Sequence, residues 1–110
     1  MATLLKNKLL ANIGSTETLI LTTGSSTRVT VIGLSLTNIT DAMVLASIRI
    51  LDTLTTDTAY YIRNVIIPPH QSLRVVNGGE KLVLSQSMSV YVQTNTESSI
   101  DLVMSYVELT

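Results

Sequence analysis

Short runs of strand-forming residues, each closed by a turn-forming cluster, follow one another about every ten residues along the 110-residue chain. Val, Ile, Thr and Tyr are plentiful, whereas Glu and Lys, which favour helix surfaces, are rare. No stretch of about ten or more residues repeats its apolar side chains with the 3.6-residue period of a helix between capping residues. The sequence therefore predicts an all-β fold, a single antiparallel β-sandwich or jelly roll of about eight short strands.

The expected strands are separated by recognisable turns. Pro68-Pro69 must end a strand, because proline lacks the backbone donor and restricts the residue before it. Asn77-Gly78-Gly79 is a tight turn of the hairpin type. The strands are expected at residues 18–23, 28–38, 44–51, 58–67, 73–76, 81–84, 88–93 and 100–107.

Residues 1–13 are expected to form an N-terminal arm or an edge strand, and residues 14–110 the sandwich domain. Lys6, Asn7 and Lys8 interrupt the apolar positions, so the pattern is neither a clean helix nor a clean strand. The apolar residues of this segment are Leu4, Leu5, Leu9, Leu10 and Ile13. Since they have no clear place in the sandwich, we expect them to be buried against a partner and to contribute to attachment more than to folding.

The strand predicted at residues 28–38 changes its apolar parity in the middle. Val29 and Val31 lie on one parity, whereas Ile32, Leu34 and Leu36 lie on the other. A β-bulge at Gly33 would direct both sets toward the core, and we expect a backbone geometry there that leaves no room for a Cβ atom.

The composition indicates a surface that associates with other proteins. Charged residues make up only 14 % of the chain, and 28 Ser and Thr residues take their place. The expected outer positions Leu45, Leu51, Val103 and Val107 are apolar, which favours contacts between subunits. We expect a homo-oligomer, and choose a trimer because threefold sites are common on protein shells.

Charge and cysteine content exclude several classes of partner. The net charge is −1 and the seven Lys and Arg residues are scattered, so the chain lacks the basic surface that nucleic acid requires. The absence of cysteine removes disulfides and Cys-based metal sites, and fits synthesis in a reducing cytosol. No segment has the composition of a signal peptide or of a membrane span, so we expect no membrane partner.

The sequence offers no catalytic constellation, and we expect neither an enzyme nor a bound cofactor or metal. His70 is the only histidine and the nearest acids in sequence, Asp57 and Glu80, are at least ten residues away, so it is expected to be a loop residue that can contact a neighbouring subunit. The acids are dispersed among turns and strand ends, where solvated carboxylates are the expectation. Residues 52–57 are the best candidate for a Ca²⁺ loop, but they contain two carboxylates and no central glycine.

Tyr60 and Tyr61 are adjacent and therefore face opposite sides of their strand. One of them is expected in the core. The other, which we assign as Tyr61, is expected to stack at an interface, and binding of a sugar ring is the alternative.

Several segments, taken in order, resemble small virion proteins of tailed bacteriophages. Residues 30–38, Thr-Val-Ile-Gly-Leu-Ser-Leu-Thr-Asn, resemble a strand that ends in Asn in those proteins, and residues 61–73 resemble their N-x-x-I-P-x-G-x-S-L turn. Residues 81–84, 90–92 and 105–108 follow in the same order of elements, so the resemblance covers about residues 28–108. It departs from the pattern where His70 or Gln71 replaces the expected Gly, and the first 27 residues match nothing in it.

The resemblance implies a β-sandwich structural protein located in the virion and assembled in the host cytoplasm. Within that class, a capsid decoration or cement subunit is expected, with the major capsid protein or other virion proteins as partners. A neck, tail or fibre component, including a receptor- or glycan-binding module, is the alternative, and it should show an exposed aromatic side chain over a polar cleft. A small β-sandwich hydrolase, the third possibility, should show a carboxylate pair in a pocket.

Overall fold

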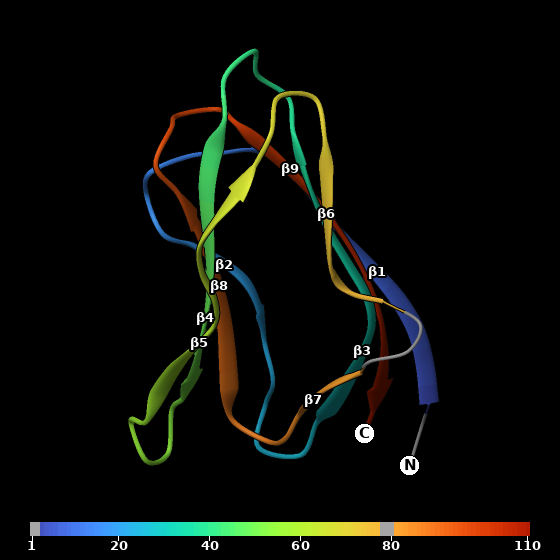
Figure 1. Ribbon diagram of the computed structural model, residues 1–110. Coiled ribbons are helices and arrows are strands. Elements are labelled where there is room, and N and C mark those ends of the chain that lie inside the picture. Colours follow the sequence, from blue (N-terminus) through green and yellow to red (C-terminus); the bar gives the residue numbers. More distant parts are fainter. Residues whose placement is uncertain (1–2, 78–80) are drawn as a thin grey trace.

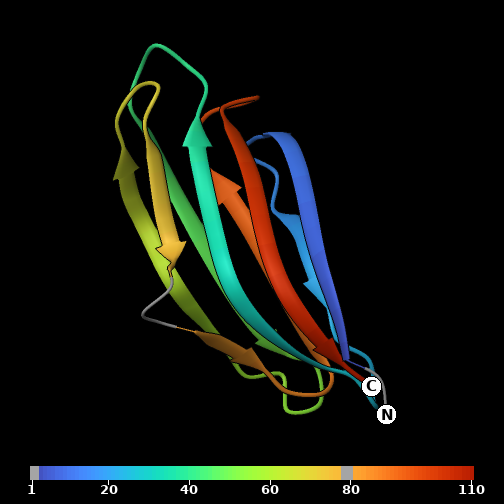
Figure 2. The ribbon, with the colours of Figure 1, turned by 90° about the vertical axis from the view of Figure 1, so that its right-hand side faces the viewer.

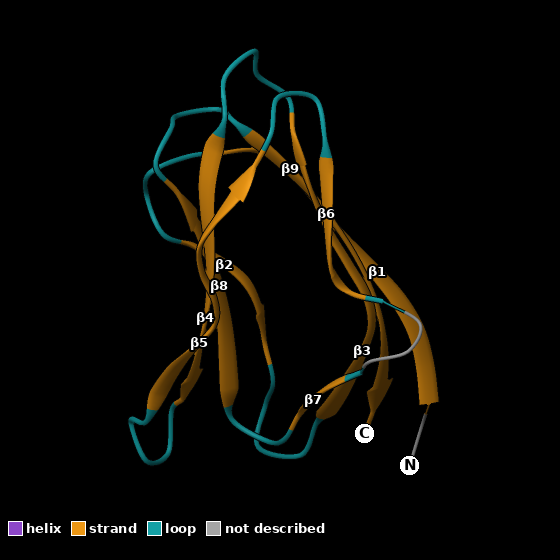
Figure 3. Ribbon diagram, viewed as in Figure 1, coloured by secondary structure: helices purple, strands orange, loops and turns teal. Residues whose placement is uncertain are grey.

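Two antiparallel β-sheets face each other in the computed structural model, which describes residues 3–77 and 81–110 (Figure 1). The larger sheet has the strand order β1-β9-β3-β6, with β7 also paired to β3, and the smaller sheet has the order β2-β8-β4-β5. Strands joined by loops account for the described residues (Figure 3). Their bounds are β1 Thr3–Ile13, β2 Thr18–Thr22, β3 Arg28–Asn38, β4 Val44–Asp52, β5 Thr58–Ile67, β6 Ser72–Val76, β7 Leu82–Leu84, β8 Met88–Thr94 and β9 Ile100–Leu109.

The pairing of strands is nested. β1 pairs with β9, β2 with β8, β3 with both β6 and β7, and β4 with β5. The chain thus folds back on itself near the loop between β4 and β5, and the resulting double strand wraps into two sheets, which is the jelly-roll arrangement. The start of β1 and the end of β9 lie side by side at one end of the sandwich (Figure 1). The predicted all-β sandwich is confirmed, and residues 3–77 and 81–110 contain nine strands, where the sequence predicts about eight.

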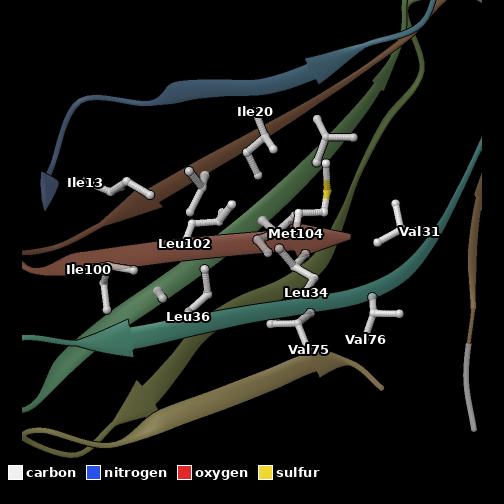
Figure 4. Packing of buried hydrophobic residues seen from close by; sticks show 14 of the residues in the cluster. Ile13, Ile20, Val31, Leu34, Leu36, Val75, Val76, Ile100, Leu102 and Met104 are labelled. Atoms are coloured by element: carbon white, nitrogen blue, oxygen red, sulfur yellow. The ribbon is translucent and has the colours of Figure 1, made fainter. Parts of the chain in front are cut away.

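The core lies between the sheets and is built from one face of each strand. On β9, Ile100, Leu102 and Met104 are almost completely buried, while Val103 between them is 47 % exposed. The same alternation on β3, β4 and β8 directs Leu, Ile and Val side chains from both sheets toward each other (Figure 4). Period-two patterning in the sequence therefore determines which face of each strand is buried.

The bulge predicted in β3 is present. The register with β9 shifts between Val31 and Gly33, and as a result Val29, Val31, Leu34 and Leu36 all lie in the core. Ile32 is the extra residue, and at 39 % exposed it lies outside the core, contrary to its predicted grouping with Leu34 and Leu36. The expected crowding at Gly33 is also wrong, because its φ is not positive and a Cβ atom there would meet nothing within 4 Å.

The N-terminal segment is a strand at the free edge of the larger sheet (Figure 2). β1 pairs with β9 in a regular register from Thr3↔Leu109 to Leu10↔Leu102, and the register shifts only beyond Leu10. Ile13 is buried and Leu10 packs against the core. The other three leucines of the segment are exposed, by 43 % for Leu4, 80 % for Leu5 and 67 % for Leu9.

The hairpin-type turn predicted at Asn77-Gly78-Gly79 falls largely on residues 78–80, outside the described residues. The strands on either side of it, β6 and β7, each pair with β3, β6 beside Leu34–Thr37 and β7 beside Val29–Val31. They therefore follow one after the other along the same edge of β3.

A buried asparagine joins three segments at one end of the sandwich. Asn38 is completely buried, and its amide nitrogen donates to the carbonyls of Ala42 (2.8 Å) and Ile67 (2.9 Å). Its side-chain oxygen accepts from the backbone N–H (2.9 Å) and the hydroxyl (2.8 Å) of Thr40. All four hydrogen-bonding positions of the amide are filled, which ties the end of β3 to the next loop and to the end of β5.

We predict that Gly33→Val leaves the free energy of unfolding unchanged within about 0.5 kcal/mol or raises it, because the site has room for the side chain and valine favours strands. Urea denaturation measures this change. Gly14→Val is the matched control, since its Cβ would lie 2.5 Å from a carboxylate oxygen of Glu97 and 3.2 Å from the Glu97 Cα atom. A lowered midpoint for Gly33→Val equal to that of the control would contradict the open geometry of the bulge.

We predict that Asn38→Asp destabilises the domain by about 1–3 kcal/mol at neutral pH. The substitution keeps the shape of the side chain but directs a carboxylate oxygen at the carbonyls of Ala42 and Ile67, which lose the amide donor of Asn38. Urea denaturation at pH 7 measures the loss. Asn95→Asp is the control, because Asn95 is exposed and its side-chain oxygen accepts from the Leu45 N–H and the Thr96 hydroxyl, both of which a carboxylate also accepts.

Candidate functional site

Four of the residues predicted to form interfaces lie together on the outer face of the larger sheet. β1 and β9 place Leu5 opposite Val107 and Leu9 opposite Val103. Residues directly opposite each other in an antiparallel pair lie on the same face, so these side chains form two cross-strand pairs on one face, with the pair Asn7 and Ser105 between them. They face away from the core, because Leu102, Met104 and Tyr106 occupy the inner face of β9.

The extra residue of the bulge joins these four side chains. Ile32 lines one surface hollow with Leu5 and Ser105 and an adjoining hollow with Val103 and Ser105. We call Leu5, Leu9, Ile32, Val103 and Val107 the outer patch. The sequence pattern predicts Ile32 in the core, and the parity change at Gly33 is the feature of the sequence that indicates an extra, outward-facing residue.

Small side chains explain the hollows in the outer patch. Ser105 lies opposite Asn7 on one side and opposite Gly33 on the other. This row of short side chains runs between the two rows that contain the leucines and valines, so the surface is lower along it. The outer face of the larger sheet therefore presents two apolar cross-strand pairs on either side of a row of small and polar side chains, and Ile32 borders the hollows along that row.

The remaining apolar interface candidates lie elsewhere. Leu4 and Leu10 are on the inner face of β1, opposite Glu108 and Leu102. Leu45 and Leu51 are half-buried on the outer face of the smaller sheet, near opposite ends of β4. The structure therefore does not bring the predicted interface residues together into one surface.

The two adjacent tyrosines occupy different environments. Tyr61, the residue assigned to an interface, is half-buried and packs against the hydrophobic core. Tyr60 is the exposed one at 47 %, and the Arg63 guanidinium lies 4.9 Å from the centre of its ring. On the adjoining strands Arg49 stacks on Tyr91 at 4.6 Å, so the outer face of the smaller sheet carries two arginine–tyrosine contacts.

His70 has a hydrogen-bond partner that lies 29 residues away in the sequence. Its Nε2 lies 2.7 Å from Oδ1 of Asp41, which comes from the loop between β3 and β4. Both side chains are open to solvent, 63 % for His70 and 97 % for Asp41, and within residues 3–77 and 81–110 no three His, Cys, Asp or Glu side chains form a cluster that could hold a metal ion. The pair therefore lacks the sheltered, oriented environment of a catalytic dyad.

The backbone at His70 explains why a glycine was expected at this turn. Its φ is +58°, in the left-handed region that glycine adopts most readily. The turn geometry is thus compatible with the glycine-containing pattern to which residues 61–73 were compared, although a histidine occupies the position.

The two carboxylates of residues 52–57 accept hydrogen bonds from within their own loop. Oδ1 of Asp52 accepts from the Leu54 N–H at 3.0 Å, and Oδ2 of Asp57 accepts from the Thr55 hydroxyl at 3.1 Å. Both acceptors therefore stabilise the loop between β4 and β5, and the Ca²⁺ candidate receives no further support.

Two glutamates on the surface have lowered pKa values. The Arg49 guanidinium donates to both oxygens of Glu17, at 2.8 and 2.7 Å, and this bidentate hydrogen bond lowers the pKa of Glu17. Hydrogen bonds from the hydroxyl and the backbone N–H of Ser15 lower the pKa of Glu97. The carboxylate of Glu108 on β9 lies 2.9 Å from the ammonium of Lys6 on β1, and this hydrogen bond raises the pKa of Lys6. These pairs have structural roles, since each joins two different strands or loops.

None of the described segments forms a helix that could span a membrane.

No protein-family model and no curated protein matches the sequence. Among solved structures, a chain of the disulfide-linked pili that form Bacillus endospore appendages matches 98 % of this chain and 88 % of its own length, with a TM-score of 0.54 and 10 % identity. A chain of the T13 IBDV viral particle matches 96 % of this chain and 30 % of its own length, with a TM-score of 0.53 and 6 % identity. At such identities these likenesses establish a shared fold.

We predict that stability falls as the pH is lowered, with a contribution from Glu17. Because its pKa is lower in the folded state, its stabilising effect is complete above the ordinary glutamate pKa of about 4.3 and is lost as the pH falls through the folded value. For an exposed pair of this kind the effect is about 0.5–1 kcal/mol. Urea denaturation between pH 7 and pH 3 measures it. Glu17→Gln should remove that share of the pH dependence, and an unchanged pH profile in this variant would contradict the assignment.

Proposed function

We propose that this protein is a structural subunit of a tailed-phage virion, a capsid decoration or cement protein that stabilises the particle through protein–protein contacts. The observation that carries the proposal is the outer patch. It is an apolar surface on a small jelly roll whose polar side chains mainly stabilise the protein's own turns and strand pairs. When another protein covers such a surface, apolar area is removed from contact with water, and this favours binding.

The similar structures support a role in repeated assemblies. One is reported from pili and the other from a viral particle, and the matched part of each shares its fold with this chain; in the viral chain that part is 30 % of the length. The pili are disulfide-linked, whereas this chain contains no cysteine. Its contacts with other subunits therefore do not include disulfides, and burial of the exposed apolar side chains is the source of binding free energy that we propose.

The proposed partners are the major capsid protein or other virion proteins, together with further copies of the chain. A homotrimer at a threefold position of the shell is the assembly that we propose for the particle. The location is the virion, after assembly in the host cytoplasm. The half-buried Leu45 and Leu51 and the exposed His70 would then lie at contacts away from the outer patch.

A neck, tail or fibre component is the alternative position within the virion. A glycan-binding role in a fibre would need an exposed aromatic side chain over a polar cleft. Tyr60 is exposed, but the Arg63 guanidinium lies over its ring at 4.9 Å, and the ring of Tyr91 is likewise covered by Arg49 at 4.6 Å. These contacts favour a structural role over glycan binding.

We predict that Val103→Asp lowers incorporation into the particle by about tenfold or more, because burying an unpaired carboxylate costs more than about 1.4 kcal/mol. The fold should be unaffected, since Val103 already faces solvent. Subunit occupancy in an electron-microscopy map of purified phage particles measures the effect. Leu54→Asp is the control, because Leu54 is 77 % exposed in the loop between β4 and β5.

Two results would contradict the proposal in different ways. Wild-type occupancy of the Val103→Asp variant would mean that attachment does not use the outer patch. Absence of the wild-type chain from the particle would mean that the protein is not a structural component of the virion.

A further inference from the structure

The free edge of β1 is long, regular and lined by exposed leucines. β1 pairs with β9 on one side, and among the described residues no strand pairs with its other side. Such an edge presents unpaired backbone N–H and C=O groups that can form a ladder with another strand. Leu5 and Leu9, exposed by 80 % and 67 %, remain accessible along it.

The sequence of β1 reads the same in both directions about Asn7. Residues 4–10 are Leu-Leu-Lys-Asn-Lys-Leu-Leu. The register with β9 is unbroken through these residues, so alternate positions keep to one face, with Leu5, Asn7 and Leu9 on the outer face and Leu4 and Leu10 on the inner face.

We propose that two copies of this chain associate through their β1 strands, antiparallel and related by a twofold axis that passes by Asn7. A twofold axis perpendicular to a sheet maps each face onto itself, so residues equally distant from Asn7 on its two sides face each other. Leu5 then lies opposite Leu9 of the second copy, and Leu4 opposite Leu10 of the second copy. The palindrome gives each leucine an apolar partner, which identifies the second copy as the occupant of this edge.

The lysines set the salt dependence of this contact. In the proposed register Lys6 lies opposite Lys8 of the second copy, and like charges in that position oppose pairing. Glu108 lies 2.9 Å from Lys6 and compensates one of the two charges, which leaves one excess positive charge at each such pair. Added salt screens the remaining repulsion, so association should become tighter as the ionic strength rises.

The pairing would join the two larger sheets into one continuous sheet. Because Leu5 and Leu9 belong to the outer patch, the outer patches of the two copies would become continuous across the axis. This inference goes beyond the proposed function, and it holds for the isolated chain with or without a particle.

Cysteine cross-linking tests the register directly, because the wild-type chain contains no cysteine. Directly opposite residues have Cα atoms about 4.5–5.5 Å apart, within disulfide reach. A mixture of the Leu5→Cys and Leu9→Cys variants should therefore form disulfide-linked dimers. In either variant alone, the two thiols would lie four residues apart along the strands, about 14 Å, which is too far.

We expect the mixture to cross-link at least tenfold faster than either variant alone, as followed on non-reducing gels. Leu54→Cys, alone or mixed with either variant, is the control for random collision, since Leu54 is similarly exposed in a loop. Cross-linking of the mixture at the rate of the control would overturn the proposal. So would equal rates for the mixture and for each variant alone, because they would require a different register.

Charge reversal provides an independent test. Lys8→Glu places a negative charge opposite Lys6 of the second copy at both symmetric positions. Sedimentation equilibrium at low ionic strength should therefore show the variant associating about tenfold more tightly than the wild-type chain, and added salt should weaken the association of the variant. Lys81→Glu is the control, with the same change in net charge away from β1. Equal association of the two variants would overturn the proposed register.

The mass of the wild-type chain separates this inference from the proposed function. Edge pairing gives an even number of chains, two alone or six if a trimer also forms through another face. A single chain at every concentration and ionic strength, or a trimer with no hexamer, would overturn the edge pairing. Neither result bears on the proposed virion function, which is tested separately by the occupancy of the subunit in purified particles.

Discussion

The ladder between β3 and β9 supports the rest of the larger sheet. It runs from Arg28↔Leu109 to Asn38↔Ile100, and each of its strands also carries an outer neighbour, β1 on β9 and β6 and β7 on β3. The bulge at Ile32 and Gly33 interrupts it once. Without this extra residue, either the valines or the leucines of β3 would face solvent, because a shift of one residue exchanges the faces of a strand. The same bulge directs Ile32 outward, so one backbone irregularity both completes the core and enlarges the outer patch.

The hydroxyl-rich composition has an internal role as well as a surface one. In the described part of the chain every buried side-chain nitrogen and oxygen has a hydrogen-bond partner. Thr94 and Ser99 bond to each other and to backbone carbonyls at the turn between β8 and β9, and the hydroxyl of Thr23 accepts from the Met88 N–H and donates to the Ser85 carbonyl. These side chains satisfy backbone groups that the turns leave unpaired, as the amide of Asn38 does at the end of β3.

The features that support the proposed function are surfaces and not reactive groups. His70 and Asp41 show how a fold can bring an acid and a base together without making a catalytic site, since both remain open to solvent on loops. The outer patch and the β1 edge, by contrast, are regular, adjacent and apolar, and they share Leu5 and Leu9. One surface can therefore serve both contacts between copies and attachment of the pair to a larger assembly.

The sequence by itself determined the β class, most strand boundaries, the position of the bulge and the outward orientation of Val103 and Val107. These depend on the two-residue period of strands and on turn chemistry, which are local properties. Tertiary structure alone decided that residues 3–13 pair with β9, that β6 and β7 both follow β3, and that Asp41 lies beside His70, because each contact joins segments far apart in the chain. It also decided that Tyr61 packs on the core while Tyr60 is exposed, since the register of β5 shifts beside them. The palindrome of residues 4–10 is present in the sequence, but it can match a second copy of the strand only because the fold leaves β1 at a free edge of the sheet.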